Sequence, residues 1–300
     1  MDFTGFKEMV KGEVLFEEPM SKHTTWRIGG PADCLFLPRD GQDICAALTY
    51  ARERDIPYMV LGNGSNMLVL DGGIRGLVIC IGDKMADYSI AGQRLTAQAG
   101  CILAKMARQT AKLGYQGLEW AAGIPASLGG AAVMNAGAYG HFFYEPLEAV
   151  EIIDKNGCLK QLAVDELEYG YRDTSLMREG AVVTKVILAL KKGDARELTA
   201  QVESTLQTRR KNQPLDLPSA GSVFKNPPGD HAGRLVEAAG LRGLSHGGAQ
   251  VSEKHGNFIV NLGQAKATDV LSLIDEVRNI VKEKFDVILE PEVRLIGEEE

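Results

Sequence analysis

The stretch GIPASLGGAAVMNAGAYG, residues 123–140, decides the fold, because eighteen positions hold five glycines, five alanines and one serine. A backbone with such small side chains can approach another group closely, and its successive N–H groups can surround an anion. A second stretch, GNGSN at residues 62–66, has the same character. Each stretch could also be a tight loop or a helix packed closely on a sheet, so both interpretations stay open at this point.

The two common phosphate-binding motifs do not explain these stretches. A P-loop requires G-x-x-x-x-G-K-[ST], but Leu128 stands where the second glycine would be, and Gly130 stands where a lysine would follow Gly129. The GNGSNM segment lacks the third glycine of a dinucleotide fingerprint, and strand-like residues follow it instead of a helix. A Walker loop and a Rossmann site are therefore excluded.

Composition narrows the class of protein. The 300 residues suit about two domains, and 33 basic against 40 acidic residues give a net charge of −7 without a long basic run. We therefore expect no nucleic-acid partner. No stretch approaches the ~18 apolar residues of a membrane span, so we expect a cytoplasmic protein with no membrane contact, and a monomer.

Cysteine and histidine positions give no sign of a metal or a disulfide framework. The five cysteines are odd in number and at least eleven residues apart, and the five histidines lack ligand spacing. We expect no metal, and reduced, mostly buried thiols.

The hydrophobic pattern predicts a mixed α+β chain. Residues 1–18 indicate a short amphipathic helix, with Phe3, Phe6 and Val10 on one side. Further elements are a helix capped by Asp40, three strands within 58–80, a hairpin at 147–162 turning at Asn156-Gly157, a helix capped by Asp194, an 18-residue helix from Thr268, and two short strands around Pro291. We expect subdomains at 1–85 and 86–193 and a further domain at 194–300.

Six motifs in order along the chain resemble those of the UDP-N-acetylenolpyruvoylglucosamine reductase family. The glycine motifs alone would indicate only the wider group of FAD enzymes with this flavin-binding fold, and the last three motifs make the match specific. The motifs are TTWRIGGPA (24–32), LGNGSNMLV (61–69), GIPASLGGAAVMNAGAYG (123–140), YRDTS (171–175), SAGSVFKNP (219–227) and EPEVRLIG (290–297).

The resemblance implies a two-subdomain FAD-binding fold of the vanillyl-alcohol-oxidase/PCMH type, followed by a C-terminal α+β substrate-binding domain. It also implies that NADPH reduces a noncovalently bound FAD. The reduced flavin then reduces the enolpyruvyl ether of a UDP-sugar to a lactyl ether, a step in peptidoglycan precursor synthesis. The short interval between Arg172 and Ser222 resembles the family's shorter class, which lacks a loop carrying a substrate-capping tyrosine.

Three side chains match the family's catalytic positions. Arg172 would bind the substrate carboxylate with its planar fork, and Ser222 would donate a proton to the carbon that bears the ether oxygen. Glu292 would assist if it is protonated or shares a proton through a hydrogen bond. Taken singly, each of these residues would be interpreted as a surface, turn or capping residue.

The resemblance also implies residues that bind the cofactor and the substrate. The cofactor-binding positions are Gly62, Asn63, Gly64, Ser65, Asn66, Gly123, Ile124, Pro125, Ser127, Gly129, Gly130, Asn135, Gly137 and Ala138. The substrate-binding positions are Tyr171, Arg209, Lys225, Asn226, His255 and Arg294. Arg209 could instead be a cation favouring a helix carboxyl terminus.

Two rival classes of function remain at this stage. An oxidase of the same flavin-binding fold would be reduced by its own hydroxylated substrate and would not respond to NADPH. A nucleotide-binding module without enzymatic activity would bind a ligand that does not react.

Overall fold

The computed structural model describes residues 1–299, which divide into two compact units. The first comprises Met1–Phe16, Cys34–Asn63 and Gly76–Gln207, and the second comprises Glu17–Asp33, Gly64–Arg75 and the chain from Thr208 onward. Each unit has a hydrophobic core of its own, the first including Phe36, Leu103 and Val186, and the second Trp26, Phe224 and Val277. The three domains expected from the sequence stay a prediction.

The N-terminal part of the chain forms a sheet of four strands, and one long helix lies between two of these strands in the sequence. The strand order is β1 (Glu13–Pro19), β2 (Pro31–Leu37), β5 (Ile74–Cys80), β3 (Tyr58–Leu61), with β3 parallel to β5. Helix α2 (Gly41–Glu53) begins where predicted, because the Asp40 carboxylate accepts a hydrogen bond from the Asp43 N–H at 2.9 Å. Short 3-10 turns follow β1 and β5 at η1 (Met20–Lys22) and η2 (Asp83–Met85).

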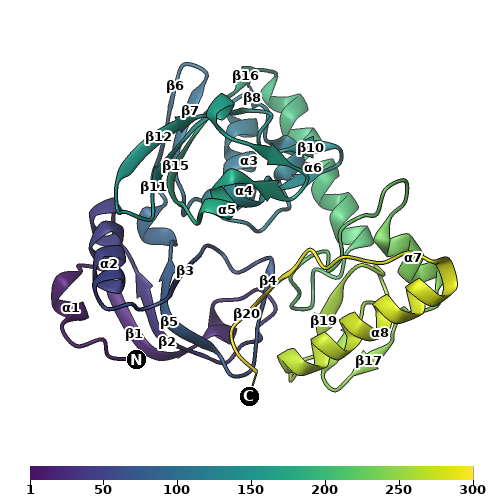
Figure 1. The fold of residues 1–300 in the computed structure, drawn as a ribbon. Helices are drawn as coiled ribbons and strands as arrows, with labels where there is room; N and C mark the ends of the chain where they lie inside the picture. The colour runs from purple at the N-terminus through teal and green to yellow at the C-terminus, as the bar shows by residue number, and fades with distance from the viewer. Residues whose placement is uncertain (300) are drawn as a thin grey trace. The chain divides into compact units, whose positions relative to one another are not determined.

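The first unit also contains a five-stranded antiparallel sheet, drawn in the upper part of Figure 1. Its order is β12 (Leu159–Ala163), β11 (Leu147–Ile153), β15 (Val182–Ala189), β7 (Arg94–Gln98), β6 (Tyr88–Ala91). Helix α4 (Leu128–Met134) packs on β15 and β7, and α3 (Leu103–Lys112) follows β7 in the chain. The predicted hairpin at 147–162 is confirmed, with Gly157 at a φ of +81° in its turn.

Smaller elements complete the first unit. They are α1 (Phe6–Met9), α5 (Ser175–Glu179), η3 (Glu119–Ala121), η4 (Val164–Glu166), and the pairs β8 (Tyr115–Gln116) with β16 (Lys191–Lys192), β9 (Gly137–Ala138) with β10 (His141–Phe142), and β13 (Tyr169–Gly170) with β14 (Asp173–Thr174). Helix α6 (Ala195–Asn212) begins at the predicted cap, where Asp194 accepts hydrogen bonds from two main-chain N–H groups.

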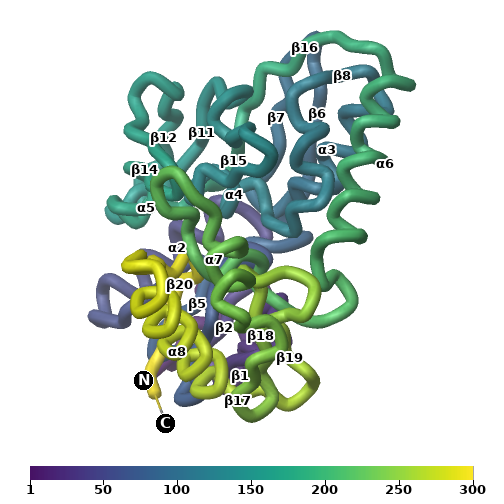
Figure 2. The backbone as a smooth tube through the Cα atoms, turned by 90° about the vertical axis from the view of Figure 1, so that its right-hand side faces the viewer, coloured from purple at the N-terminus to yellow at the C-terminus, as the bar shows by residue number. Residues whose placement is uncertain are grey.

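In the second unit, helix α8 (Ala267–Phe285) packs on β17 (Ser245–His246) and β18 (Ala249–Val251), as Figure 2 shows. Strand β19 (Ile259–Asn261) completes that sheet, and α7 (Ala232–Ala238) packs on α8. The Asp71 carboxylate accepts from the N–H groups of Ala267 and Thr268 at 2.9 and 3.0 Å. A side chain far away in the sequence therefore caps the helix that the pattern predicted.

Two sequence predictions were wrong in detail. The expected N-terminal helix is only one turn long, and β1 replaces its second half, because residues 13–19 pair with β2. Gly12, just before β1, lies against the Leu37 carbonyl, where a Cβ would come within 2.2 Å. Of the two strands expected around Pro291, only β20 (Arg294–Ile296) forms, pairing in parallel with β4 (Met67–Val69). Proline has no N–H for a ladder, and Pro291 makes only an isolated bridge to Phe224.

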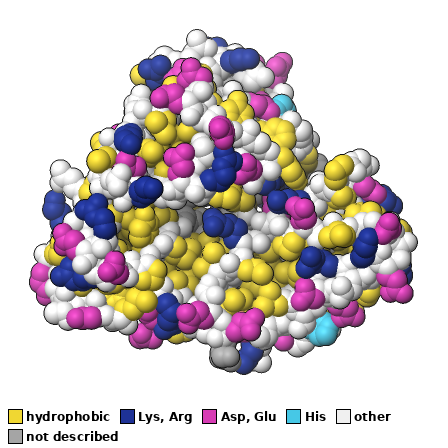
Figure 3. Space-filling model, in the orientation of Figure 1, with side chains coloured by type: hydrophobic (Ala, Val, Ile, Leu, Met, Phe, Trp, Pro, Cys, Tyr) yellow, Lys and Arg dark blue, Asp and Glu magenta, His cyan; other side chains and the backbone are white. Residues whose placement is uncertain are grey.

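The surface mixes both signs of charge. On the face drawn in Figure 3, Lys and Arg side chains alternate with Asp and Glu, and no large patch of one sign is seen there. Three of the five cysteines, Cys34, Cys80 and Cys101, are buried, whereas Cys158 is exposed. Among residues 1–299, no helix combines the length and the apolar character needed to cross a membrane.

Candidate active site

The loop Gly62–Asn66 follows β3 and leads into β4. A Cβ on Gly62 would come within 2.2 Å of the Ser127 Oγ, and the Asn63 amide donates to the Pro125 carbonyl at 2.5 Å. Gly62 and Asn63 therefore meet the longer glycine stretch inside the first unit. Among the described residues, none of the five main-chain N–H groups of this loop donates to an acceptor of the protein. Such unused donors suit an anionic ligand.

Gly64, in the same loop, is a glycine for a structural reason of its own. Its φ is +58°, and a Cβ there would come within 2.1 Å of the His23 carbonyl. The Gly64 carbonyl accepts from the Thr25 N–H at 3.1 Å. Gly64 therefore joins the loop to the TTWRIGGPA motif within the second unit.

The start of α4 uses its donors differently. The Leu128 and Gly129 N–H groups donate to the carbonyls of Cys101 and Ala99 at 2.8 and 2.9 Å, and Ser127 caps the helix by accepting from Gly130. A Cβ on Gly129 would come within 2.8 Å of the Ala99 Cβ. For Gly129 the geometry favours the second interpretation of the sequence, a helix packed closely on a sheet.

A pocket of about 250 Å³ opens beside both glycine stretches in the first unit. Its wall includes Gly62, Asn63, Gly82, Gly100, Lys105 and Ser127. A Cβ on Gly100 would come within 2.0 Å of the Gly82 carbonyl, so the narrow wall depends on glycine. Glycine walls and the unused N–H groups of Gly62 and Asn63 fit part of a dinucleotide that carries phosphates, and Lys105 and Asp83 place one charge of each sign in the wall.

Arg172 lies in the turn between β13 and β14. Its backbone has a φ of +56°, a conformation that non-glycine residues rarely adopt. The guanidinium donates to the carbonyls of Asn135 and Gly137 at 3.2 and 3.1 Å, and its carbon lies 4.9 Å from the centre of the Tyr171 ring. A strained residue with its side chain held in place is typical of a functional position.

Asn135 supports this hairpin through its side chain. It lies at the C-terminus of α4 with a φ of +41°, is 4% exposed, and donates from Nδ2 to the Gly170 carbonyl at 2.9 Å. Its Oδ1 accepts from the Tyr144 N–H at 3.3 Å. Both ends of the amide therefore bind the protein, and the neighbouring Gly137 and Ala138 form β9.

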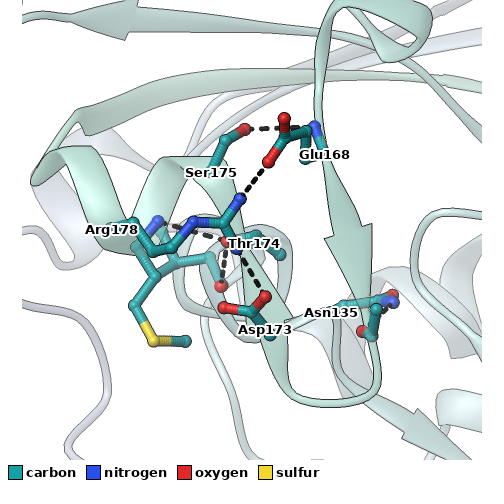
Figure 4. A network of polar contacts seen from close by, with 9 residues as sticks. Asn135, Glu168, Asp173, Thr174, Ser175 and Arg178 are labelled. Atoms are coloured by element: carbon teal, nitrogen blue, oxygen red, sulfur yellow. Dashed lines mark hydrogen bonds and ion pairs between the residues drawn. The ribbon is translucent and has the colours of Figure 1, made fainter.

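A polar network braces the hairpin from its other side (Figure 4). Arg178 of α5 forms ion pairs with Glu168 and Asp173, and the Ser175 N–H donates to the Glu168 carbonyl at 2.8 Å. The Thr174 hydroxyl donates to the Val133 carbonyl at 2.6 Å, which ties the hairpin to α4. The YRDTS motif is therefore a braced turn whose arginine points to α4.

Ser222 and Glu292 lie in the second unit on two segments that pair. The Glu292 N–H donates to the Val223 carbonyl at 2.7 Å, and the Lys225 N–H donates to the Glu290 carbonyl at 2.8 Å. Phe224 and Pro291 form an antiparallel bridge between these two hydrogen bonds. The pairing brings Glu292 opposite Val223, the residue that follows Ser222, although sixty-nine positions separate Val223 from Glu292 in the sequence.

Asn66 joins the glycine loop to the Glu292 segment. Its side-chain amide donates to the Glu292 carbonyl at 3.2 Å, and its own carbonyl accepts from the Arg294 N–H at 3.1 Å. The parallel pair β4 and β20 begins directly after these contacts. Arg294 lies at the start of β20 and is exposed.

The remaining substrate positions have different surroundings. The Lys225 ammonium lies 3.4 Å from a Glu290 carboxylate oxygen, and the Asn226 side chain accepts from the Ala232 N–H at the start of α7. Burial lowers the pKa of His255, whose Nδ1 accepts from the Asn257 N–H at 3.1 Å. Arg209 lies in the last turn of α6.

Two residues of interest were not predicted from the sequence. Lys105 borders the pocket from α3, and Asn257 contacts the segment after Ser222. Lys105 had no signal beyond a helical pattern, and Asn257 resembled any polar residue within a strand. Among residues 1–299, no group of three His, Cys, Asp or Glu side chains could hold a metal ion.

Two family models match the chain. The model described as FAD binding domain matches residues 32–163, and the model described as UDP-N-acetylenolpyruvoylglucosamine reductase, C-terminal domain, matches residues 213–296. A relative from Heliobacterium modesticaldum, named UDP-N-acetylenolpyruvoylglucosamine reductase, is 50% identical over 289 residues, covering 96% of this chain and 92% of the relative. The chain belongs to the UDP-N-acetylenolpyruvoylglucosamine reductase family.

Other relatives agree with this family assignment. A reductase of the same name from Moorella thermoacetica is 47% identical and covers 96% of this chain and 95% of its own length. The crystal structure of the reductase from Thermus caldophilus matches with a TM-score of 0.82 at 38% identity, covering 96% of this chain and 99% of that one. The protein is therefore an FAD oxidoreductase, and the predicted α+β flavin-binding fold of the vanillyl-alcohol-oxidase/PCMH type with its C-terminal domain is confirmed.

Proposed function

We propose that the protein uses NADPH to reduce UDP-N-acetylglucosamine-enolpyruvate to UDP-N-acetylmuramate, in the cytoplasm, as a step of peptidoglycan precursor synthesis. The observation that carries the proposal is the pairing of Val223–Lys225 with Glu290–Glu292. It holds a hydroxyl-bearing residue and a carboxyl-bearing residue on adjacent segments. A hydroxyl that can donate a proton and a carboxyl that can share one suit a reaction that adds a proton beside a substrate carboxylate.

The glycine loop and the pocket are proposed to hold FAD. The unused N–H groups of Gly62–Asn66 would bind the pyrophosphate, and the pocket wall at Gly82, Gly100 and Lys105 would contact adjoining parts of the cofactor. Pro125 and Ser127 border the same loop through the Asn63 and Gly62 contacts, and Gly123 and Ile124 directly precede them in the sequence. When bound, FAD would supply the hydride that reaches the terminal carbon of the enolpyruvyl group.

Arg172 would bind the substrate carboxylate. An enolpyruvyl ether is electron-rich, so its terminal carbon accepts hydride only if negative charge that develops toward the carboxylate is stabilised. The carbonyls of Asn135 and Gly137 set the plane of the guanidinium in advance. A planar fork oriented in this way can bind a carboxylate through two parallel hydrogen bonds.

Ser222 would then donate its hydroxyl proton to the carbon that bears the ether oxygen, which completes the lactyl ether. A serine hydroxyl is a weak acid, so the serine oxygen left behind must be stabilised. Lys225, three residues further on, offers a positive charge for this purpose. Glu292 would share a proton with the substrate carboxylate through a hydrogen bond.

The other family positions stay proposals of the same kind. Tyr171 is adjacent to Arg172 and lies beside its guanidinium, whereas Asn226, His255 and Arg294 belong to the second unit together with Ser222. Arg209, at the end of α6, is proposed to bind a substrate phosphate.

Anaerobic spectroscopy of the purified protein with FAD tests the proposal in two steps. NADPH should bleach the flavin absorbance, and the enolpyruvyl UDP-sugar should then restore it with formation of UDP-N-acetylmuramate. A protein that is bleached by a small hydroxylated substrate and ignores NADPH would be an oxidase of the same fold. A protein that binds nucleotide without any flavin signal would overturn the proposal altogether.

A further inference from the structure

Asn257 is a buried asparagine that binds the backbone next to Ser222. The residue is 3% exposed. Its Oδ1 accepts from the Phe224 N–H at 2.9 Å, and its Nδ2 donates to the Phe224 carbonyl at 2.8 Å. The Asn257 carbonyl accepts from the Val223 N–H at 2.9 Å. One residue therefore makes three hydrogen bonds to the two residues that follow Ser222.

These contacts complete the support of a short segment on both sides. The Glu292 N–H donates to the Val223 carbonyl. Asn257 accepts from the N–H groups of Val223 and Phe224 and donates to the Phe224 carbonyl. On the other side of Ser222 stands Gly221, with a φ of +79° and no atom within 4 Å of an added Cβ. The backbone directly after Ser222 is therefore held by hydrogen bonds on both of its sides.

We propose that Asn257 is a positioning residue that holds Ser222 in the orientation required for proton donation. The inference rests on the proposed function, because it assigns Ser222 as the proton donor. At neutral pH a side-chain amide presents both a donor and an acceptor, which match the N–H and C=O of a single residue. Loss of the amide would leave both Phe224 groups unpaired in a buried place and release the segment.

Asn261 provides a matched control in the same part of the chain. It is 4% exposed, its Nδ2 donates to the Trp26 carbonyl at 3.0 Å, and its Oδ1 accepts from the Gly263 N–H at 2.7 Å. Its side chain therefore holds backbone as Asn257 does, but not the backbone next to Ser222. A purely structural effect should be similar at the two positions.

The first experiment compares Asn257→Ala with Asn261→Ala in the FAD-loaded protein. Both variants should melt at lower temperature than the unchanged protein, and NADPH should reduce the flavin at similar rates in both. In Asn257→Ala, reoxidation by the enolpyruvyl UDP-sugar should be slower by about 10²-fold than in Asn261→Ala, as expected for a misplaced reacting group. Reoxidation rates that agree within about twofold would overturn the inference.

The second experiment, with Asn257→Asp, keeps the test valid if Asn257→Ala does not fold. A protonated carboxyl can still accept from the Phe224 N–H and donate to its carbonyl, whereas an ionised one has no proton to donate. The ratio of its reoxidation rate to that of the unchanged protein should fall at least tenfold as the pH rises. In Asn261→Asp the same ratio should stay level.

Other titratable groups near position 257 are present in all these proteins. They are His255 on the same segment, Glu237 of α7, which accepts from the Gly256 N–H at 3.2 Å, and Glu292 opposite Val223. Because they are present in both proteins of each ratio, the ratio removes the part of their titration that the substitution leaves unchanged. A ratio for Asn257→Asp that does not change with pH would contradict the inference, whereas an unchanged protein that the enolpyruvyl UDP-sugar does not reoxidise would contradict the proposed function instead.

Discussion

The hairpin that carries Arg172, in the first unit, and the segment that carries Ser222, in the second, hold their side chains by different means. Arg172 has a strained backbone with a φ of +56°, and the ion pairs of Arg178 that brace its hairpin are exposed to solvent. The Ser222 segment has ordinary pairing with Glu290–Glu292 and a buried amide at Asn257.

The two segments differ in which interactions stabilise the position of the functional side chain. Exposed ion pairs contribute little, with a median below about 1 kcal/mol, so the Arg172 hairpin depends on two carbonyls of the chain and on its tie to α4. The Ser222 segment depends on buried hydrogen bonds, whose loss leaves unpaired groups. Changes near Arg172 should therefore alter binding first, and changes near Ser222 should alter stability and chemistry together.

The largest effect is expected from Ser222→Ala. NADPH should still reduce the flavin at the normal rate, but reoxidation by the enolpyruvyl UDP-sugar should slow by about 10² to 10⁴-fold, because only that step needs the proton. Stopped-flow absorbance of both steps measures this. Ser219→Ala is the control in the same stretch, and equal damage to both steps in Ser222→Ala would refute the assignment.

Arg172→Lys should produce the next largest effect. Lysine keeps the charge but cannot reproduce two parallel hydrogen bonds to a carboxylate, so the KM for the enolpyruvyl UDP-sugar should rise by at least about tenfold. Reduction by NADPH should not change. Arg178→Lys, on the bracing side, should leave steady-state kinetics nearly unchanged, and a comparable effect there would contradict the contrast between binding and bracing.

Backbone strain at residue 172 predicts a smaller effect on stability. Arg172→Ala and Arg172→Gly both remove the guanidinium, but only glycine adopts a φ of +56° without cost. Arg172→Gly should therefore unfold with a free energy about 1 kcal/mol higher than Arg172→Ala. Urea unfolding of both variants gives the difference.

Substitutions of Arg178 provide a control, because there the glycine variant should be less stable than the alanine variant. Arg178 lies within α5, where glycine is less favourable than alanine by up to about 1 kcal/mol. Arg178→Gly should therefore be less stable than Arg178→Ala. If the glycine variant is more stable than the alanine variant at both positions, or less stable at both, the argument that residue 172 stores strain fails.

His255 should give the smallest effect, in the second unit. Burial lowers its pKa in the folded protein below the ordinary value of about 6.5, so the folded state favours the neutral ring. Its contribution to stability is present above about pH 6.5 and is lost as the pH falls below that value through the folded pKa. The free energy of unfolding of His255→Gln should decline less between about pH 7.5 and 5.5 than that of the unchanged protein.

An exposed histidine provides the comparison for this measurement. His231→Gln should show the same decline as the unchanged protein, because its ring is exposed before α7. If the free energies of unfolding of His255→Gln and His231→Gln decline equally as the pH falls, burial of the His255 ring does not contribute to the loss of stability in acid.

Local pattern was sufficient for most elements of this chain. Asp40 and Asp194 begin helices where their side chains predicted, and the Asn156-Gly157 turn closes its hairpin. These features depend on interactions within a few residues, which the sequence displays directly. The six motifs likewise led to the correct family.

Contacts between distant segments could not be predicted in this way. Residues 13–19 form a strand because Pro31–Leu37 pairs with them, and β20 forms because Met67–Val69 offers a parallel partner more than two hundred residues away. Neither partner is visible in a local pattern, so propensity gave the wrong element at one end of the chain and one strand too many at the other.

By itself, the sequence determined the family, the flavin-binding fold and the candidates Arg172, Ser222 and Glu292, because residue types at motif spacing are a property of the chain alone. Only the tertiary structure decided how those candidates are held. Within residues 1–299 it assigned the N–H group of Gly129 to packing and left those of Gly62–Asn66 unused, and it brought Asn257 to the backbone beside Ser222. Hydrogen bonds between segments far apart depend on how the chain folds back on itself, and no single segment contains that information.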